Sequence, residues 1–204
     1  MSEAKFITLE GVDGAGKSTH IDFIKSYFIS KSLDYILTRE PGGTNMGEKI
    51  REILLNDEMS PIAESLLMFA ARSEHISLVI RPNLRNGVTV ISDRFTDASY
   101  AYQSAGKGVS SSTIKELKMI VQENLEPDLT LLFDLPVEVS IERLSNTRVL
   151  DRFEKQNYEF HQRVREAYLN IANENKGRFY IIDSTKSISD IQKEIKTILD
   201  KTTK

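Results

Sequence analysis

One short segment constrains the fold of this chain more than any other. Residues Gly11–Ser18 read G-V-D-G-A-G-K-S and directly follow the apolar run Phe6–Leu9. The pattern G-x-x-x-x-G-K-[ST] after a strand is typical of a loop whose backbone N–H groups surround a phosphate. An ordinary glycine-rich turn is the alternative. The helical spacing of Ile21, Ile24 and Phe28 favours strand, loop and helix in succession, and hence a nucleotide site.

Short apolar runs alternate with amphipathic stretches along the rest of the chain. Alternation of this kind predicts an α/β fold, a five-stranded parallel sheet flanked by helices on both faces. We expect strands at Phe6–Leu9, Tyr35–Leu37, Val88–Ile91, Leu129–Phe133 and Phe179–Ile182. We expect helices near Lys17–Ser30, Gly47–Leu55, Ile62–Ile80, Thr113–Glu123, Val137–Leu144, Asn157–Asn175 and Ser189–Leu199. Polar clusters follow several strands, so they are expected to meet in one cleft at the carboxyl edge of the sheet.

Composition bounds the class of protein. The 204 residues suit one domain spanning 1–204. A net charge of -3 gives no basic field for nucleic acid, and the absence of a long apolar run predicts no membrane span and a cytoplasmic protein. There is no cysteine, and His20, His75 and His161 lack metal-ligand spacing. We expect the histidines to be ordinary surface or helix residues.

Three positions indicate how the phosphate site works. Lys17 brings a mobile positive charge, and the Ser18 hydroxyl is a ligand for the Mg²⁺ that accompanies ATP or GTP. Asp93 follows a strand at the point where a P-loop protein orients this ion, although a strand-end turn is the alternative. The segment that begins at Asp93 is not Asp-x-x-Gly, and the sole Asn-Lys pair, Asn175-Lys176, continues as Gly-Arg. The guanine-reading pattern of GTPase switches is therefore missing.

Taken together, these and later motifs resemble the thymidylate kinase family over essentially the whole length. The matching segments are Gly11–Thr19, Thr38–Thr44, Leu67–Arg72, Asp93–Phe95 and Ser99–Gln103. The resemblance implies a nucleoside-monophosphate-kinase fold, usually a homodimer. It also implies transfer of the γ-phosphate of MgATP to dTMP, a step of dTTP synthesis. The ATP-binding residues it implies are Gly11, Val12, Asp13, Gly14, Ala15, Gly16, Lys17, Ser18, Thr19 and Arg143, the last lying over adenine.

The resemblance also implies roles for residues of the acceptor site. Phe69 is expected to stack on thymine, with core packing as its alternative, and Arg72 to donate to O4, with a solvated helix face as its alternative. Tyr102 is expected to crowd the 2′ position of the sugar, unless it only packs. Pro41 is expected near the thymine methyl, Ser99 and Gln103 at the base edge, and Arg39 and Arg94 at the acceptor phosphate.

Asp13 is an unusual residue for a phosphate loop, because polyphosphate repels a carboxylate. By resemblance it bonds the acceptor's 3′-hydroxyl; an Asx-type turn is the alternative. The segment 143–153 is similar to a lid. Gly14 has no side chain to supply the charge that some relatives carry in the loop, so the likeness to bacterial-type members implies Arg148 and Arg152 as the arginines that supply it. The other catalytic residues that the resemblance implies are Lys17, Asp13 and Arg94.

Two alternatives remain at this stage. The first is another small P-loop kinase, acting on deoxynucleosides, other monophosphates or a non-nucleotide acid; Phe69 and Arg72 argue against it. The second is a nucleotide-binding regulatory protein with a decayed site. Against it, Lys17, Ser18 and Asp93 are all present. Competition between acceptor substrates would distinguish another small P-loop kinase from a thymidylate kinase. Turnover of ATP with an acceptor would exclude a regulatory protein with a decayed site.

Overall fold

The computed structural model describes residues 4–145 and 151–203. Its single sheet is entirely parallel, in the order β2-β3-β1-β4-β5, so the predicted architecture is confirmed. The strands are β1 (Phe6–Glu10), β2 (Tyr35–Arg39), β3 (Thr89–Asp93), β4 (Leu129–Asp134) and β5 (Phe179–Asp183). The central strand β1 is buried at all five positions, which explains the apolar and small residues of Phe6–Leu9 that precede its last residue, Glu10.

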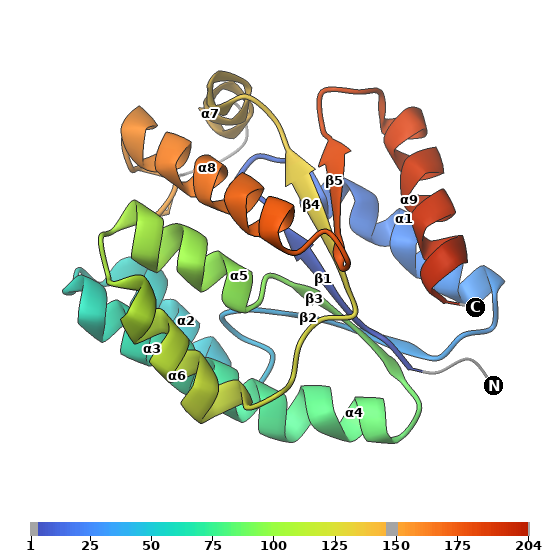
Figure 1. Cartoon of the computed structure of the whole chain (residues 1–204), viewed down its shortest axis with the longest axis horizontal. Coiled ribbons are helices and arrows are strands. Elements are labelled where there is room, and N and C mark those ends of the chain that lie inside the picture. The colour runs from blue at the N-terminus through green and yellow to red at the C-terminus, as the bar shows by residue number, and fades with distance from the viewer. Residues whose placement is uncertain (1–3, 146–150, 204) are drawn as a thin grey trace.

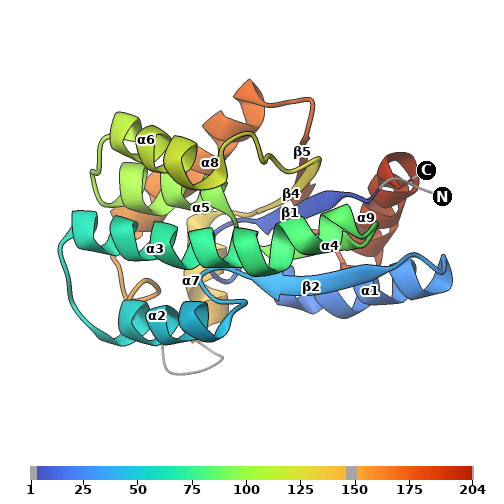
Figure 2. The ribbon, with the colours of Figure 1, turned by 90° about the horizontal axis from the view of Figure 1, so that it is seen from below.

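Helices cover both faces of this sheet (Figure 1). One face carries α1 (Lys17–Ser30) and α9 (Ile188–Thr202), and most of the remaining helices lie on the other side of the sheet (Figures 1 and 2). Those are α2 (Asn45–Asn56), α3 (Pro61–His75), η1 (Ile76–Ile80), α4 (Arg81–Arg85), α5 (Thr96–Ser99), η2 (Tyr100–Gly106), α6 (Ser111–Gln122) and α8 (Tyr158–Glu174), while α7 (Val137–Ser145) lies at the carboxyl edge of the sheet. In the described part of the chain no helix is long and apolar enough to cross a bilayer.

The helices differ from expectation in two places. The helix expected to end at Ile80 continues through a π-helical turn into α4, where Pro82 lies in the first turn and needs no N–H partner. The segment 96–106, for which no helix range is predicted, is helical as α5 and η2. Its sequence shows no regular apolar period, and its order comes from burial between α3 and α8.

The three histidines are also buried, so the helix part of their expected position is confirmed and the surface part is wrong. All three lie on helices, and the exposed fractions of His20, His75 and His161 are 3, 0 and 1%. His20 stacks on Phe133, with ring centroids 5.7 Å apart. Burial therefore makes each of these histidines part of the packed interior.

Candidate active site

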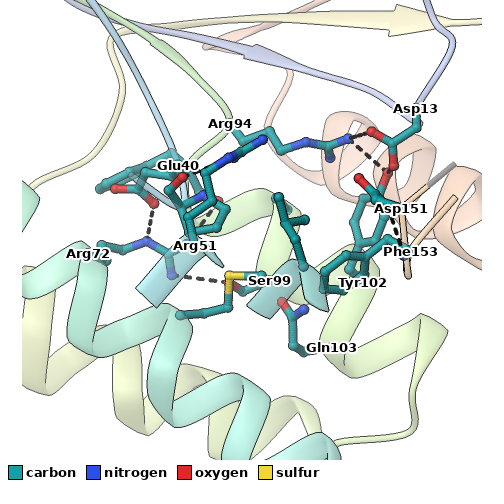
Figure 3. A pocket seen from close by; sticks show the side chains of 15 residues that line it. Asp13, Glu40, Arg51, Arg72, Arg94, Ser99, Tyr102, Gln103, Asp151 and Phe153 are labelled. Atoms are coloured by element: carbon teal, nitrogen blue, oxygen red, sulfur yellow. Dashed lines mark hydrogen bonds and ion pairs between the residues drawn. The ribbon is translucent and has the colours of Figure 1, made fainter. Parts of the chain in front are cut away.

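Two pockets open at the carboxyl edge of the sheet, beyond the ends of β1, β2 and β3. The first contains residues of the phosphate loop, among them Gly14, Lys17 and Ser18, and we call it the loop pocket. The second lies between α3 and α5–η2, and we call it the Arg72 pocket (Figure 3). The residues that line both pockets are Asp13, Glu40, Arg51, Arg94 and Asp151. The two pockets therefore meet, as the sequence predicts for groups at one sheet edge.

The phosphate loop has the backbone that its glycines allow. Gly11, Gly14 and Gly16 have φ values of 137, 77 and 88°, a region that favours glycine. Gly16 precedes α1, so the positive end of that helix dipole faces the loop pocket. Lys17 lies in the same pocket, and its Nζ donates to the carbonyl oxygen of Gly11 at 3.2 Å. Burial lowers the pKa of the Lys17 ammonium, and the nearby charge of Arg94 lowers it further.

A magnesium ion fits the two positions expected to hold it. Ser18 and Asp93 both line the loop pocket, and Ser18 is exposed there. Oδ1 of Asp93 is buried without a hydrogen-bond partner, as is expected of an oxygen that receives a partner when nucleotide is bound. The described residues contain no cluster of three or more His, Cys, Asp or Glu side chains that could hold a metal. The phosphates would therefore complete the coordination of this ion.

Asp13 and Arg94 bond to each other at the junction of the pockets (Figure 3). Arg94 Nη2 donates to Asp13 Oδ1 at 2.6 Å and to the Tyr102 hydroxyl at 2.9 Å, and that hydroxyl donates to Asp13 Oδ2 at 2.8 Å. Burial alone would raise the pKa of Asp13, but attraction by Arg94 and Lys17 outweighs burial and holds the pKa at about 2. The Asp13 side chain is thus oriented by Arg94 and Tyr102 and stays charged, which argues against a merely local Asx turn.

A buried carboxyl lies behind this junction. Glu10, the last residue of β1, is 0% exposed and accepts from the backbone N–H of Phe95 and from the hydroxyl of Tyr168, each at 2.7 Å. Burial and repulsion by Asp97 raise the pKa of Glu10 to about 8. Tyr168 in turn accepts from Arg94 Nη1 at 3.2 Å. A chain of polar groups therefore connects the core to the Arg94 guanidinium.

Arg72 is buried at one end of its pocket and held by three acceptors. Its Nε donates to Glu40 Oε2 at 2.6 Å, Nη1 to Ser99 Oγ at 3.1 Å and Nη2 to the carbonyl oxygen of Phe95 at 3.2 Å. Glu40 also bonds His75 Nδ1 at 2.9 Å. A guanidinium carries five N–H donors, so two remain for a ligand in the pocket. The alternative of a solvated helix face for Arg72 is wrong, since the residue is 2% exposed.

Two expected acceptor residues do not line the Arg72 pocket. Phe69 is 2% exposed and packs with Val109 and Ile114, with the Arg72 guanidinium 4.5 Å from its ring centre. Met68, one residue earlier on α3, lines the pocket instead. A shift of one residue rotates a helical side chain by about 100°, so the motif identifies this helix without deciding which side chain faces the ligand. The other is Arg39, which lines the loop pocket and pairs with Glu48 at 2.8 Å.

The remaining acceptor residues lie in the Arg72 pocket as expected, and their roles stay predictions. They are Asp13, Pro41, Arg72, Arg94, Ser99, Tyr102 and Gln103. Arg51 is a residue that the motifs did not reveal: it lines both pockets, and its Nη1 donates to the carbonyl oxygen of Pro41 at 3.0 Å. The only signal in the sequence is an arginine on an otherwise amphipathic helix, which is common on surfaces and therefore weak.

The lid segment divides into parts with different positions. Arg143 lines the loop pocket and donates to the carbonyl oxygen of Ser184 at 3.0 Å, next to Gly16. Arg148 lies outside the described residues. Arg152 does not reach the loop pocket, because its Nη2 donates to Glu64 Oε2 at 2.5 Å and to the Leu54 carbonyl oxygen at 2.8 Å. In this structure Arg152 therefore anchors the lid, contrary to the expected catalytic position.

Comparisons with known proteins identify the family of this chain. The sequence model of thymidylate kinase matches residues 9–195. The chain is 50% identical over 195 residues to thymidylate kinase of Methylobacillus flagellatus, covering 96% of each chain, and 51% identical over 197 residues to that of Cupriavidus necator, covering 96% of this chain and 97% of that one. The solved structure of thymidylate kinase from Ehrlichia chaffeensis superposes with a TM-score of 0.76 at 32% identity, covering 96% of this chain and 98% of that one.

Fold and site together define a P-loop kinase, with a phosphate loop after β1 and a second pocket that meets it beyond the ends of β1, β2 and β3. Among P-loop kinases, the chain belongs to the thymidylate kinase family.

Proposed function

We propose that this chain transfers the γ-phosphate of MgATP to dTMP and so forms dTDP and ADP. The observation that carries the proposal is the junction of the two pockets at Asp13 and Arg94. A nucleotide in the loop pocket would present its last phosphate at this junction, and a nucleoside monophosphate in the Arg72 pocket would bring its phosphate to the same point. Alignment of this kind is the main demand of phosphoryl transfer.

The chemistry of the Arg72 pocket favours a keto pyrimidine as acceptor. Arg72 only donates hydrogen bonds, so it suits O4 of thymine and would face the amino group of cytosine with another donor. Such an unpaired contact costs about 1–3 kcal/mol. Tyr102, fixed by Arg94 and Asp13, is suited to crowd a ribose 2′-hydroxyl. Pro41 and Met68 provide the apolar wall for the base.

The groups around the junction would divide the catalytic work. Arg94 and Arg51 lie where the acceptor phosphate would sit, and Asp13 would accept from the 3′-hydroxyl of the acceptor. Lys17 would follow the transferred phosphoryl group. Mg²⁺, held by Ser18 and Asp93, would neutralise charge on the donor phosphates. Arg143 suits the adenine end of the loop pocket, and Arg148 is the expected lid arginine.

The proposal extends to assembly and location. We expect a homodimer in the cytoplasm. In support of the dimer, large apolar side chains are exposed on adjoining helices: Ile62 and Leu66 on α3, and Met119 and Ile120 on α6, with exposed fractions of 49, 53, 64 and 76%. A second copy of the chain covering these helices would bury them. Sedimentation velocity of the wild type against Leu66→Asp tests this; equal masses corresponding to one chain would contradict it.

The reaction is tested by ADP release with MgATP and a panel of acceptors: dTMP, dUMP, UMP, dCMP, AMP and thymidine. The proposal expects the highest kcat/KM with dTMP, and no turnover without Mg²⁺. Lys17→Met serves as an inactive control. If AMP or thymidine is phosphorylated best, the acceptor is wrong while a P-loop kinase remains. If ATP binds and no acceptor reacts, the chain is a nucleotide-binding protein without this activity.

A further inference from the structure

Glu64 is a buried carboxylate that the proposed chemistry does not use. It lies in the first turn of α3 and is 0% exposed, yet it touches neither nucleotide pocket directly. Three donors from other segments bond to it. Lys107 Nζ and Arg152 Nη2 each donate to Oε2 at 2.5 Å, and Gln103 Nε2 donates to Oε1 at 2.9 Å. A buried carboxylate with three partners is held in one position.

The bond to Gln103 determines which atom of that amide faces the pocket. Gln103 is 2% exposed and lines the Arg72 pocket on the same helical face as Ser99 (Figure 3). Since one N–H of its NH₂ group is bonded to Glu64, whose carboxylate can only accept, the amide oxygen is the acceptor that is available to a ligand. Among the described residues, no donor bonds to this oxygen. Gln103 therefore offers an acceptor, although glutamine is in general equally able to donate.

We propose that Glu64 is a positioning residue that sets the base specificity of this pocket through the orientation of the Gln103 amide. The proposal rests on the proposed function, because it concerns the acceptor base. Thymine and uracil carry an N–H at ring position 3 between two keto oxygens, whereas cytosine carries a lone pair there. Arg72 provides donors for a keto oxygen, and Gln103, held by Glu64, provides the acceptor for the N3–H.

The two cations hold Glu64 itself. Lys107 lies 4.6 Å from the ring centre of Phe153, and Arg152 lies 4.8 Å from it on the lid side. Phe153 lines the Arg72 pocket, so the carboxylate that orients Gln103 is also tied to the lid wall of that pocket. Arg152 adds bonds to the carbonyl oxygen of Leu54 from Nε at 3.1 Å and Nη2 at 2.8 Å. Gln103 and, through the two cations, the Phe153 wall of the pocket are therefore both connected to one carboxylate.

Glu64→Gln tests the proposal with a defined sign. A carboxamide at position 64 can donate to Gln103, so the Gln103 amide can turn and present its NH₂ group to the pocket. We expect kcat/KM for dTMP to fall about tenfold or more, mostly through KM, while kcat/KM for dCMP is unchanged or rises. The KM for MgATP should stay within twofold. Glu74→Gln, on the same helix and outside both pockets, should leave the dTMP-to-dCMP ratio as in the wild type.

Equal losses with dTMP and dCMP would overturn the proposal, since they would mean that Glu64 serves only the fold. A double variant with Gln103→Leu adds a second check: the ratio should change no further than in Gln103→Leu alone. Failure of the proposed function is separate, because it would be seen in the wild type as no preference for dTMP. In that case the acceptor base itself is misassigned.

If Glu64→Gln does not fold, a measurement on the wild type still tests the proposal. It compares dUMP with its N3-methyl analogue, in which the N3–H is replaced by N–CH₃ while both keto oxygens remain. We expect at least a tenfold loss of kcat/KM with the analogue, and we expect Gln103→Leu to remove the difference between the two. Equal use of both compounds by the wild type would overturn the proposal, because the pocket would not then read the N3–H.

Discussion

Arg94 Nη2 donates to Asp13 Oδ1 at 2.6 Å across 81 residues of sequence. The contact joins the phosphate loop to the turn after β3, where Arg94 has a φ of 72°, an uncommon value for a residue with a side chain. The neighbouring bond from Tyr102 to the other oxygen of Asp13 completes the arrangement. Strained residues near a site persist only when the surroundings hold them, so these bonds couple the geometry of the two pockets.

Asp13→Asn tests this coupling. The change keeps the size of the side chain but removes the charge that pairs with Arg94, and an amide nitrogen toward Arg94 or Tyr102 would face a donor. We expect kcat/KM for dTMP to fall at least tenfold, with MgATP affinity unchanged or improved because a negative charge leaves the loop. Steady-state kinetics and ATP titration measure both. Weakened ATP binding with normal dTMP kinetics would contradict the coupling. Asp22→Asn, on the exposed face of α1, is the control.

The bonds from Glu40 to Arg72 and His75 predict a stability effect. His75 Nε2 lies 2.6 Å from Thr38 Oγ1 and Nδ1 lies 2.9 Å from Glu40 Oε1, with the ring fully buried. His75→Leu would leave the buried Oε1 of Glu40 without this partner, at a cost of about 1–3 kcal/mol, and would also remove the bond of the half-buried Thr38 hydroxyl. Urea unfolding should show this loss, while the exposed Ser73→Ala should not. A change below about 0.5 kcal/mol would mean that water replaces the ring.

Glu10 predicts a pH dependence of stability. Its pKa of about 8 in the folded protein lies above the ordinary value of 4.5, so the folded state binds the proton more tightly. This contribution is complete below the unfolded pKa and is lost as pH rises toward about 8. The free energy of unfolding of the wild type should therefore decline between these pH values. Glu10→Gln should flatten this decline. Urea unfolding from pH 5 to 8.5 tests the difference, with the exposed Glu116→Gln as control. Parallel curves for wild type and Glu10→Gln would refute the prediction.

Arg51 is expected to act at the junction of the pockets. Because it lines both pockets and is fixed by the Pro41 carbonyl oxygen, Arg51→Ala should raise the KM for dTMP tenfold or more. The exposed Lys49→Ala, two residues earlier on α2, should not. A matched pair of acceptors, dTMP and thymidine, separates a phosphate contact from a general effect: thymidine binding should be nearly insensitive to the change. If Arg51→Ala weakens the binding of dTMP and of thymidine equally, Arg51 only supports the packing of the pocket and does not contact the acceptor phosphate.

Local pattern predicted the class of fold and most of its elements. The five strands begin within one residue of their expected positions, because each contains a short apolar run that is visible without tertiary information. Such runs are required in β1, β3 and β4, which are buried along most of their length, whereas the edge strands β2 and β5 are partly exposed. The phosphate loop could also be predicted from the sequence, since its glycines occupy backbone positions with positive φ, which other residues rarely adopt. The helical segment 96–106 was not predicted, because packing between α3 and α8 stabilises it rather than its own periodicity.

By itself, the sequence determined the phosphate loop, the parallel sheet and the group of residues that surround the second pocket. Only the tertiary structure decided which side chain of a motif faces the ligand: Met68 rather than Phe69 lines the pocket, and Arg152 bonds Glu64 rather than reaching the loop pocket. A motif identifies the segments that form the site, whereas the direction of each side chain depends on contacts with residues far away in the sequence. Glu64 and Arg152 are 88 residues apart, and no local pattern connects them.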